Sequence, residues 1–200
     1  MGSINRRRSE RNIFTTNIGT NTMKNENTQE NQEVQPVIYI ACLASYNAGI
    51  LHGEWIVPSS DEEELQEQIN AILKTSSQPS AEEWAVHDYD NFHDLGEYPS
   101  ISDICKVQES IDEHGYELVN AYLQYHNDIN SLDEIGDSYI GEYNSFQEYA
   151  EQYLMDCDSF SLIPEHLQYY FDYESYAKNL EYDYSVVESN KHTVFIFSNF

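Results

Sequence analysis

The first regular pattern of apolar residues consists of two short apolar runs, one on each side of a turn-forming segment. The stretch PVIYIACLASYNAGILHGEWIV, residues 36–57, is rich in β-branched residues before and after Ser45–Gly49. This pattern predicts a β-hairpin in which Asn47 and Gly49 supply the unusual backbone dihedrals of the turn. The segment EEWAVHDYDNF, residues 82–92, predicts a further strand of the same small unit.

Helical spacing of apolar residues appears between these strands and dominates after Pro99. Ser60 with Glu63 forms a capping box, and the helix that follows presents one apolar face, made of Leu65, Ile69, Ile72 and Leu73. A second helix opens at Ser100 and Asp103, with Ile101, Ile104, Val107 and Ile111 on one face. His114 and Gly115 stop it, and a third helix carries Leu118, Val119, Tyr122 and Leu123. Ser131 with Glu134 predicts the cap of a short turn.

The last third of the chain mixes both patterns. Ser145 with Glu148 caps a helix that runs through Tyr149, Tyr153 and Leu154, and Pro164 opens another. The terminal run HTVFIF, residues 192–197, predicts a strand. We expect this strand to form an apolar sheet edge, which a homodimer would bury at a two-fold interface.

The pattern as a whole predicts an α+β protein made of three small domains after a disordered tail. The expected boundaries are residues 1–36 for the tail, 37–99 for a mixed domain, 100–138 for a helical domain and 139–200 for a second mixed domain. The first 35 residues are rich in Asn, Thr, Ser and Gln, and they hold too few large apolar side chains to offset the entropy of ordering. An inert tail is favoured over one whose arginines fold back onto an acidic body.

Charge changes the picture, because the chain holds 36 Asp and Glu against 9 Lys and Arg, a formal net charge of −27. The first 35 residues sum to +1, so the rest carries −28, with four lysines and no arginine after Arg11. A field of this sign repels nucleic acid and anionic membranes, so we expect neither as a partner. Aromatic residues make up 14% of the chain, which favours a folded body over an acidic disordered one.

Candidate chemistry adds little. Cys42, Cys105 and Cys157 form no C-x-x-C motif, which indicates a reducing compartment and, with no apolar run of membrane-spanning length, a cytoplasmic location. The seven histidines include no metal-binding pair, and the stretch after Asp88 departs from a calcium loop at Phe92 and His93. No nucleophile or phosphate-binding motif is present, so we expect no enzyme activity, no metal and no cofactor.

The stretch IPEHLQYYFDYESYAKNLEYDYS, residues 163–185, combines six tyrosines, five carboxylates and one lysine. Tyrosine covers apolar surface without adding a cation, and its hydroxyl group donates to a neighbouring carboxylate. An equally open interpretation is that Tyr169, Tyr173 and Tyr176 are core residues on a helix.

The acids themselves are the candidate functional residues. Asp61, Glu62 and Glu63 also suit a helix N-terminus, but the lack of compensating cations predicts a surface that presents negative charge. The expected surface carboxylates are Asp61, Glu62, Glu63, Glu82, Glu83, Asp88, Asp90, Asp94, Glu97, Asp103, Glu109, Asp112, Glu113, Glu117, Asp128, Asp133, Glu134, Asp137, Glu142, Glu148, Glu151, Asp156, Asp158, Glu165, Asp172, Glu174, Glu181 and Asp183. Duplex DNA carries one charge per roughly 1.7 Å, so 28 charges match about 48 Å of duplex as an upper bound.

Three separated segments carry a family resemblance. IYIACLASYNAGILHGEWI, EEWAVHDYDNF and IPEHLQYYFDYESYA, together with the acidic and aromatic FQEYAEQYLMD, resemble the ArdA antirestriction family of DNA mimics over about residues 37–200. The resemblance implies an elongated dimer, joined through its C-terminal part, that occupies the DNA-binding surface of Type I restriction-modification enzymes at the methyltransferase core and protects a mobile genetic element. The family's antirestriction motif would fall on residues 146–160, including Phe146, Glu148, Tyr149, Glu151, Tyr153 and Leu154.

Two other classes stay open on the residues alone. A general acidic binder of basic DNA-binding proteins would share the charge, and a halophile-type acidic enzyme would share both the excess of acids and the shortage of lysine. Competition with DNA for one defined enzyme discriminates among the three.

Overall fold

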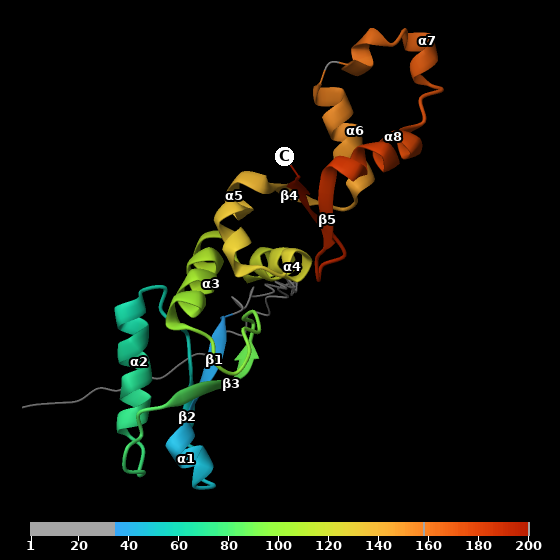
Figure 1. Ribbon diagram of the computed structural model, residues 1–200. Coiled ribbons are helices and arrows are strands. Elements are labelled where there is room, and N and C mark those ends of the chain that lie inside the picture. The colour runs from blue at the N-terminus through green and yellow to red at the C-terminus, as the bar shows by residue number, and fades with distance from the viewer. Residues whose placement is uncertain (1–34, 158, 200) are drawn as a thin grey trace, which may run out of the picture. The chain divides into compact units, whose positions relative to one another are not determined.

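The computed structural model describes residues 35–157 and 159–199 of the chain (Figure 1). The predicted tail lies outside the described residues, apart from Gln35 and Pro36. Helices and two small antiparallel sheets make up the described part, so the predicted α+β class is confirmed.

The first sheet has the strand order β2-β1-β3 and is antiparallel throughout. The elements of this part are β1 (Val37–Cys42), α1 (Leu43–Asn47), β2 (Gly53–Ile56), α2 (Glu62–Lys74) and β3 (Trp84–Asp90). Helix α2 lies beside β1 and β2, where its apolar face is buried in one cluster with Ile38 and Ile40 (Figure 1). The predicted hairpin, helix and third strand are therefore all present.

The connection between the hairpin strands differs from the predicted turn. Residues 43–47 form the short helix α1, so Asn47 has helical dihedrals and the prediction for it was wrong. Gly49 does adopt a positive φ of 76°. A helical turn satisfies the backbone groups here, because the amides of Ala48 and Ile50 both donate to the carbonyl oxygen of Ser45.

Two of the four predicted helix caps were wrong. The cap of α2 is Asp61 rather than Ser60, and its Oδ1 accepts the amides of Glu63 and Glu64, each at 2.9 Å. Asp128 rather than Ser131 caps the 3-10 helix Ile129–Glu134. In both places a carboxylate stands near the predicted hydroxyl residue, and a charged acceptor at a helix N-terminus forms the stronger hydrogen bond.

The helical middle part matches its prediction closely. Its elements are α3 (Ile101–His114), α4 (Tyr116–His126), η1 (Ile129–Glu134) and α5 (Ile135–Ser138). Ser100 caps α3 by accepting the amide of Asp103 at 3.1 Å. Gly115, with a φ of 83°, separates α3 from α4 in a conformation that disfavours residues with a side chain.

The C-terminal part contains the second sheet, and here the predicted edge strand was wrong. The elements are β4 (Tyr139–Tyr143), α6 (Phe146–Asp156), η2 (Ser159–Leu162), α7 (Glu165–Gln168), α8 (Tyr173–Leu180), η3 (Glu181–Asp183), β5 (Tyr184–Glu188) and β6 (Val194–Ser198). The order is β4-β6-β5, so the terminal strand β6 pairs on both sides and is central. Strand β5 supplies the pairing that the prediction lacked, through a hairpin closed by Ser189 and Thr193.

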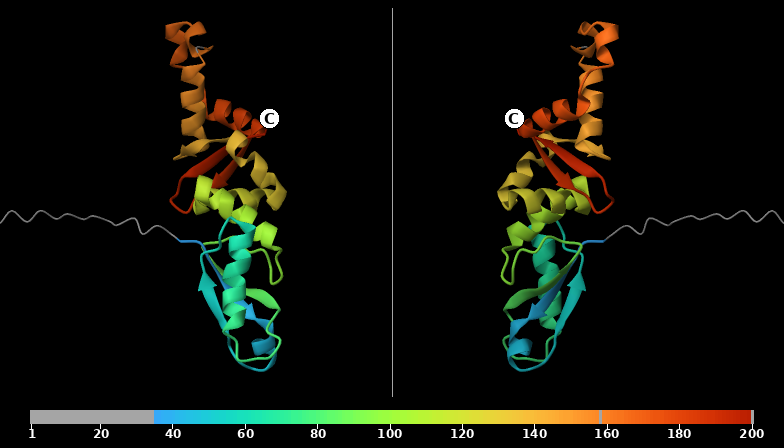
Figure 2. Two further views of the ribbon diagram at one scale, coloured as in Figure 1. Left: turned by 90° about the vertical axis from the view of Figure 1, so that its left-hand side faces the viewer. Right: turned by 90° about the vertical axis from the view of Figure 1, so that its right-hand side faces the viewer.

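Strand β6 contributes to two cores, one on each of its faces. Phe195 and Phe197 join the cluster that contains α4, where the Phe197 ring lies 5.0 Å from that of Tyr122. Ile196 points the other way and is buried with Phe146 of α6 and with residues of α8. The side chains of β6 alternate between the two faces because successive residues of a strand point to opposite sides of the sheet. On the side of Ile196, helices α6 and α8 lie side by side in both views of Figure 2.

The larger cluster runs through segments that were assigned to three domains. It includes Ile38 from β1, Val119 from α4 and Phe197 from β6, and contacts group all described residues as one compact unit. The division into domains at residues 99 and 138 stays a prediction.

Candidate functional site

The predicted surface carboxylates lie on the surface. Every one that the structure describes is exposed except Asp103, Glu117 and Glu151, which are half-buried. Asp158 lies outside the described residues. Among the described residues no Asp or Glu is buried, so the negative charge is available to a partner.

Lysines remove little of this charge. Three of the four lysines after residue 35 each pair with one carboxylate, in the pairs Lys106–Asp133, Lys178–Glu174 and Lys191–Glu117. The hydrogen bond from each ammonium raises the pKa of Lys178 and of Lys191. Each pair is neutral as a unit, so the remaining carboxylates set the sign of the surface field.

One group of carboxylates has a structural task. Asp61, Asp128 and Asp172 cap helices, and Glu148 accepts the backbone amide of Asn144 at 2.9 Å. The amide of Ser175, which donates to Asp172 at 2.9 Å, lowers the pKa of that carboxyl group. Replacing these acids would therefore change the fold as well as the charge.

A second group has no such task. Within the described part of the chain, this group includes six exposed glutamates that accept no hydrogen bond and form no ion pair: Glu62, Glu63, Glu82, Glu83, Glu109 and Glu134. Glu62 and Glu63 lie in the first turn of α2, where negative charge suits the helix dipole. The other four repel neighbouring carboxylates and stabilise no element through a hydrogen bond, which is a cost that an ordinary mixed surface avoids.

The structure separates the three tyrosines of the stretch that were weighed as core residues. Tyr169 is 89% exposed, so it is not a core residue. Tyr176 is half-buried and packs against the cluster of α6, α8 and β6, and Tyr173 contacts the ring of Phe171. Elsewhere in the chain, the Tyr98 hydroxyl group donates to Glu97 at 3.0 Å and thereby raises its own pKa.

The predicted motif region, residues 146–160, is mainly a packing element where the structure describes it. Phe146, Tyr149 and Leu154 are buried, and the first two form a core with Ile196. Ser145 caps α6 by accepting the amide of Glu148 at 3.2 Å, as predicted. Glu151 accepts from Gln147, and Tyr153 is exposed. Within this region the exposed face of α6, rather than its buried face, is available to a partner.

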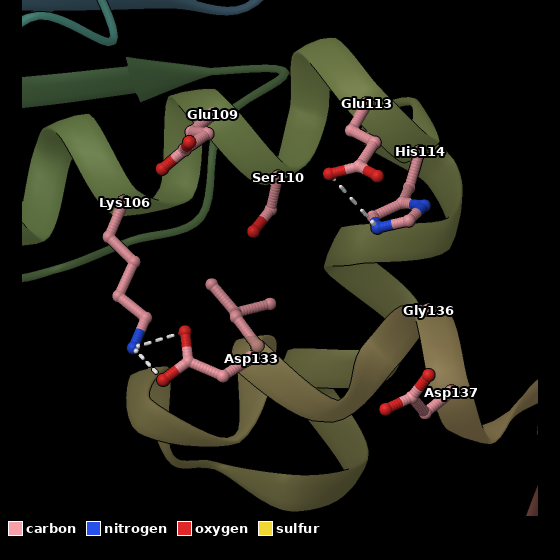
Figure 3. A pocket seen from close by; sticks show the side chains of 9 residues that line it. Lys106, Glu109, Ser110, Glu113, His114, Asp133, Gly136 and Asp137 are labelled. Carbon is pink, nitrogen blue, oxygen red and sulfur yellow. Dashed lines mark hydrogen bonds and ion pairs between the residues drawn. The ribbon is translucent and has the colours of Figure 1, made fainter.

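A polar hollow of about 280 Å³ lies beside α3 and η1 (Figure 3). Lys106 Nζ lies 2.9 and 3.0 Å from the two carboxylate oxygens of Asp133 at one side. At the other side the rim carries Glu113, whose carboxylate is 3.8 Å from His114 Nε2, and Asp137. Carboxylates outnumber the one lysine here, so this hollow continues the negative surface.

A second hollow, of about 490 Å³, lies at β3 and is called the β3 hollow below. Its lining residues are Tyr46, Val86, His87, Asp88, Tyr89, Asp94, Gly96 and Glu97. The pairing of β1 with β3 shifts between Tyr39 and Ile40, which leaves His87 as the extra residue of a β-bulge. His87 and Asp88 are consecutive and both exposed, whereas a regular strand would turn one of them inward.

The acids of the β3 hollow are among the predicted surface carboxylates, but their grouping could not be predicted from the sequence. Residue 46 lies far from residues 86–97 in the sequence, and no sequence pattern marks the bulge that brings these side chains together. The Tyr89 hydroxyl group donates to the carbonyl oxygen of Gly96 at 2.6 Å. Burial, with the nearby charge of Asp94, raises the pKa of Tyr89.

Within residues 35–157 and 159–199, no three His, Cys, Asp or Glu side chains are grouped so that they could hold a metal ion. In that part of the chain no helix has both the length and the apolar character needed to cross a bilayer.

Comparison with known proteins gives one clear result. The search of curated proteins found no match. A family model described as antirestriction protein (ArdA) matches residues 38–194, which is most of the chain. The match includes nearly all of the first sheet, the helical middle part and strands β4 and β5, and it ends at the first residue of β6. The chain therefore belongs to the ArdA family of antirestriction proteins.

Proposed function

We propose that this protein inhibits Type I restriction-modification enzymes by imitating DNA, and that it occupies the DNA-binding groove of their methyltransferase core. The observation that carries the proposal is the exposure of nearly all described carboxylates on a body in which three of the four lysines after residue 35 are paired. The fold holds these charges on helices and strands, so they keep fixed positions as phosphates do.

The amount of charge suits this role. Residues 36–200 carry a net charge of −28, which equals that of about 48 Å of duplex, on the order of 14 base pairs. Not every carboxylate faces one way, so a single chain imitates a shorter stretch. A homodimer would lengthen the imitated duplex.

We propose such a homodimer, joined through the C-terminal part. Because β6 is central, its edges are not the interface that the sequence suggested. Exposed apolar and aromatic side chains near α7 and α8 offer a better surface, including Leu162, Tyr169, Tyr170 and Tyr182. Sedimentation at micromolar concentration tests this, and a monomer there contradicts it.

The biological setting follows from the target. The inhibitor would act in the cytoplasm, where incoming DNA of a mobile genetic element meets the restriction enzyme. It would need no cofactor and no catalytic residue, since competition for a binding groove involves no chemical step.

The test is displacement of a labelled duplex from a Type I methyltransferase core by the full chain. We expect displacement, loss of methylation as well as cleavage, weaker binding at higher salt because anions bound to the enzyme are released, and no binding of the protein to DNA. Binding alongside DNA without displacing it would instead favour a general acidic binder.

A charge series sharpens the test. Glu→Gln at Glu62, Glu63, Glu82, Glu83, Glu109 and Glu134 removes six charges that support no hydrogen bond in the described structure. Glu→Asp at the same six positions keeps the charge and serves as the matched control. We expect progressive loss of displacement in the first series and near-normal displacement in the second, because a spread field depends on total charge.

A further inference from the structure

The β3 hollow combines aromatic walls with carboxylates. Tyr46 is 54% exposed and its ring lies 4.9 Å from that of His87, at an interplanar angle of 81°. Tyr89 forms a half-buried wall whose hydroxyl group is held by Gly96. The hollow has a volume of about 490 Å³, within the range of about 300–1,000 Å³ that is usual for ligand sites.

Each of the three carboxylates of the hollow is held through one oxygen and leaves the other free. Asp88 Oδ1 accepts the amide of Tyr89 at 2.9 Å, and Asp94 Oδ1 accepts the amide of Gly96 at 2.8 Å. Glu97 Oε1 accepts the Tyr98 hydroxyl group at 3.0 Å. In the described structure the second oxygen of each has no hydrogen-bond or ion-pair partner.

The loop that carries two of these acids is itself fixed to the sheet. The amide of Val86 donates to the carbonyl oxygen of Glu97 at 3.0 Å. Together with the bulge at His87, this bond brings Asp94 and Glu97 next to Asp88. The free oxygens are therefore oriented before any ligand arrives, which lowers the ordering cost of binding.

We propose that the β3 hollow is a binding site for the guanidinium group of an arginine side chain. A guanidinium group is planar, stacks on aromatic rings and donates to carboxylates in a fork, so it uses both the walls and the free oxygens. An ammonium group uses the charge but gains less from the rings.

The occupant to which we assign the site is an arginine on the basic DNA-binding surface of the target enzyme. That assignment rests on the proposed function, whereas affinity for a guanidinium group does not. None of the four lysines after residue 35 lines the hollow. An arginine of the enzyme bound in the hollow would add one specific contact to the electrostatic attraction between the acidic surface and the basic surface of the enzyme.

The test uses N-acetylarginine amide as the probe, with the full chain followed by amide NMR. We expect saturable shifts centred on residues 86–97, smaller effects with N-acetyllysine amide, and none with the uncharged N-acetylcitrulline amide. Tyr46→Ala should reduce the preference for arginine over lysine. Shifts centred elsewhere, or equal shifts with citrulline, would overturn the proposal.

A matched pair of double variants isolates the carboxylates. Asp88→Asn with Asp94→Asn keeps an oxygen for the Tyr89 and Gly96 amides but removes two charges from the hollow. Glu82→Gln with Asp90→Asn removes two exposed charges from β3 and its flank outside the hollow. We expect about tenfold weaker probe binding in the first pair and less than about twofold in the second. Equal weakening would overturn the site.

The same variants in the DNA-displacement assay separate the two proposals. Greater loss of displacement in the Asp88/Asp94 variant than in its control supports the anchor. Equal loss in both variants overturns the anchor. If the unaltered chain binds the probe but displaces no DNA, the proposed function fails while the guanidinium site stands.

Discussion

Replacing Phe197 by alanine tests whether the terminal strand connects the helical middle part to the rest of the fold. Phe197 is 1% exposed, and its ring lies 5.0 Å from that of Tyr122 and 5.6 Å from that of Tyr139. Removing a buried phenylalanine costs about 3–5 kcal/mol, including the aromatic contacts. Domains of this size are stable by about 5–15 kcal/mol, so the loss is a large fraction of the total.

The expected fall in melting temperature is about 6–20 °C, from roughly 2–4 °C per kcal/mol for a chain of this length. Urea unfolding followed by circular dichroism gives the free energy directly. Leu51→Ala is the control, since Leu51 is 87% exposed and its loss should change stability by less than about 0.5 kcal/mol. A loss below about 1 kcal/mol for Phe197→Ala would refute the assigned packing.

The two tryptophans add a second readout. Trp55 and Trp84 both belong to the first sheet, so their fluorescence reports that part of the chain alone. If the larger cluster is one cooperative core, Phe197→Ala shifts the fluorescence and dichroism transitions together. A fluorescence transition that stays in place would refute the continuous core and support separate domains.

Four further outcomes are expected. Ser145→Ala should destabilise by about 1 kcal/mol in urea unfolding because it removes the cap of α6, whereas Ser145→Asp should not. Asp103→Asn should leave DNA displacement nearly unchanged, since one charge in a spread field matters little; complete loss with intact folding would indicate a discrete site. Moderate salt should raise the melting temperature by screening repulsion, and a decrease would contradict this. Burial raises the pKa of Tyr89 and Tyr149 above 10 in the folded state, so stability should be full below pH 10 and fall as pH rises further, measured by melting temperature; no change would contradict it.

The helical spacing of the apolar residues and the capping residues made most of the helices predictable from the sequence. The apolar faces of α2, α3, α4 and α6 repeat at helical spacing, and Ser100 and Ser145 stand immediately before their first helical residues. The cap prediction failed where an aspartate competes with a nearby serine, as at Asp61. The capping-box motif alone does not tell whether the aspartate or the serine accepts the hydrogen bonds of the helix N-terminus.

The strands of the second sheet were harder to predict, because each is short and their pairing is tertiary. Strand β5 begins at Tyr184, inside the acidic tyrosine stretch, and only Ser185 of its five residues is buried. Without β5, the apolar run of β6 looked like an edge. Its role as a central strand depends on a hairpin whose turn places His192 at a φ of 63°.

The candidate site likewise has a part that could be predicted from the sequence and a part that could not. Exposure of the carboxylates followed from composition, since a folded body with this many acids and so few cations has nowhere else to put them. The β3 hollow could not be predicted from the sequence, because Tyr46 contacts His87 only through the pairing of β1 with β3 and the bulge within it.

The arrangement also explains how such a charged chain folds. The cores on the two faces of β6 and beneath the first sheet contain no carboxylate among the described residues, so repulsion acts only across water, where it is weak and screened. Aspartates at helix N-termini accept backbone amides, and these capping hydrogen bonds offset some of the repulsion between carboxylates. Exposed carboxylates that form no hydrogen bond and no ion pair, such as Glu82, Glu83, Glu109 and Glu134, are therefore ones that the fold does not require. A role for them in binding gives the most direct physical reason for their retention.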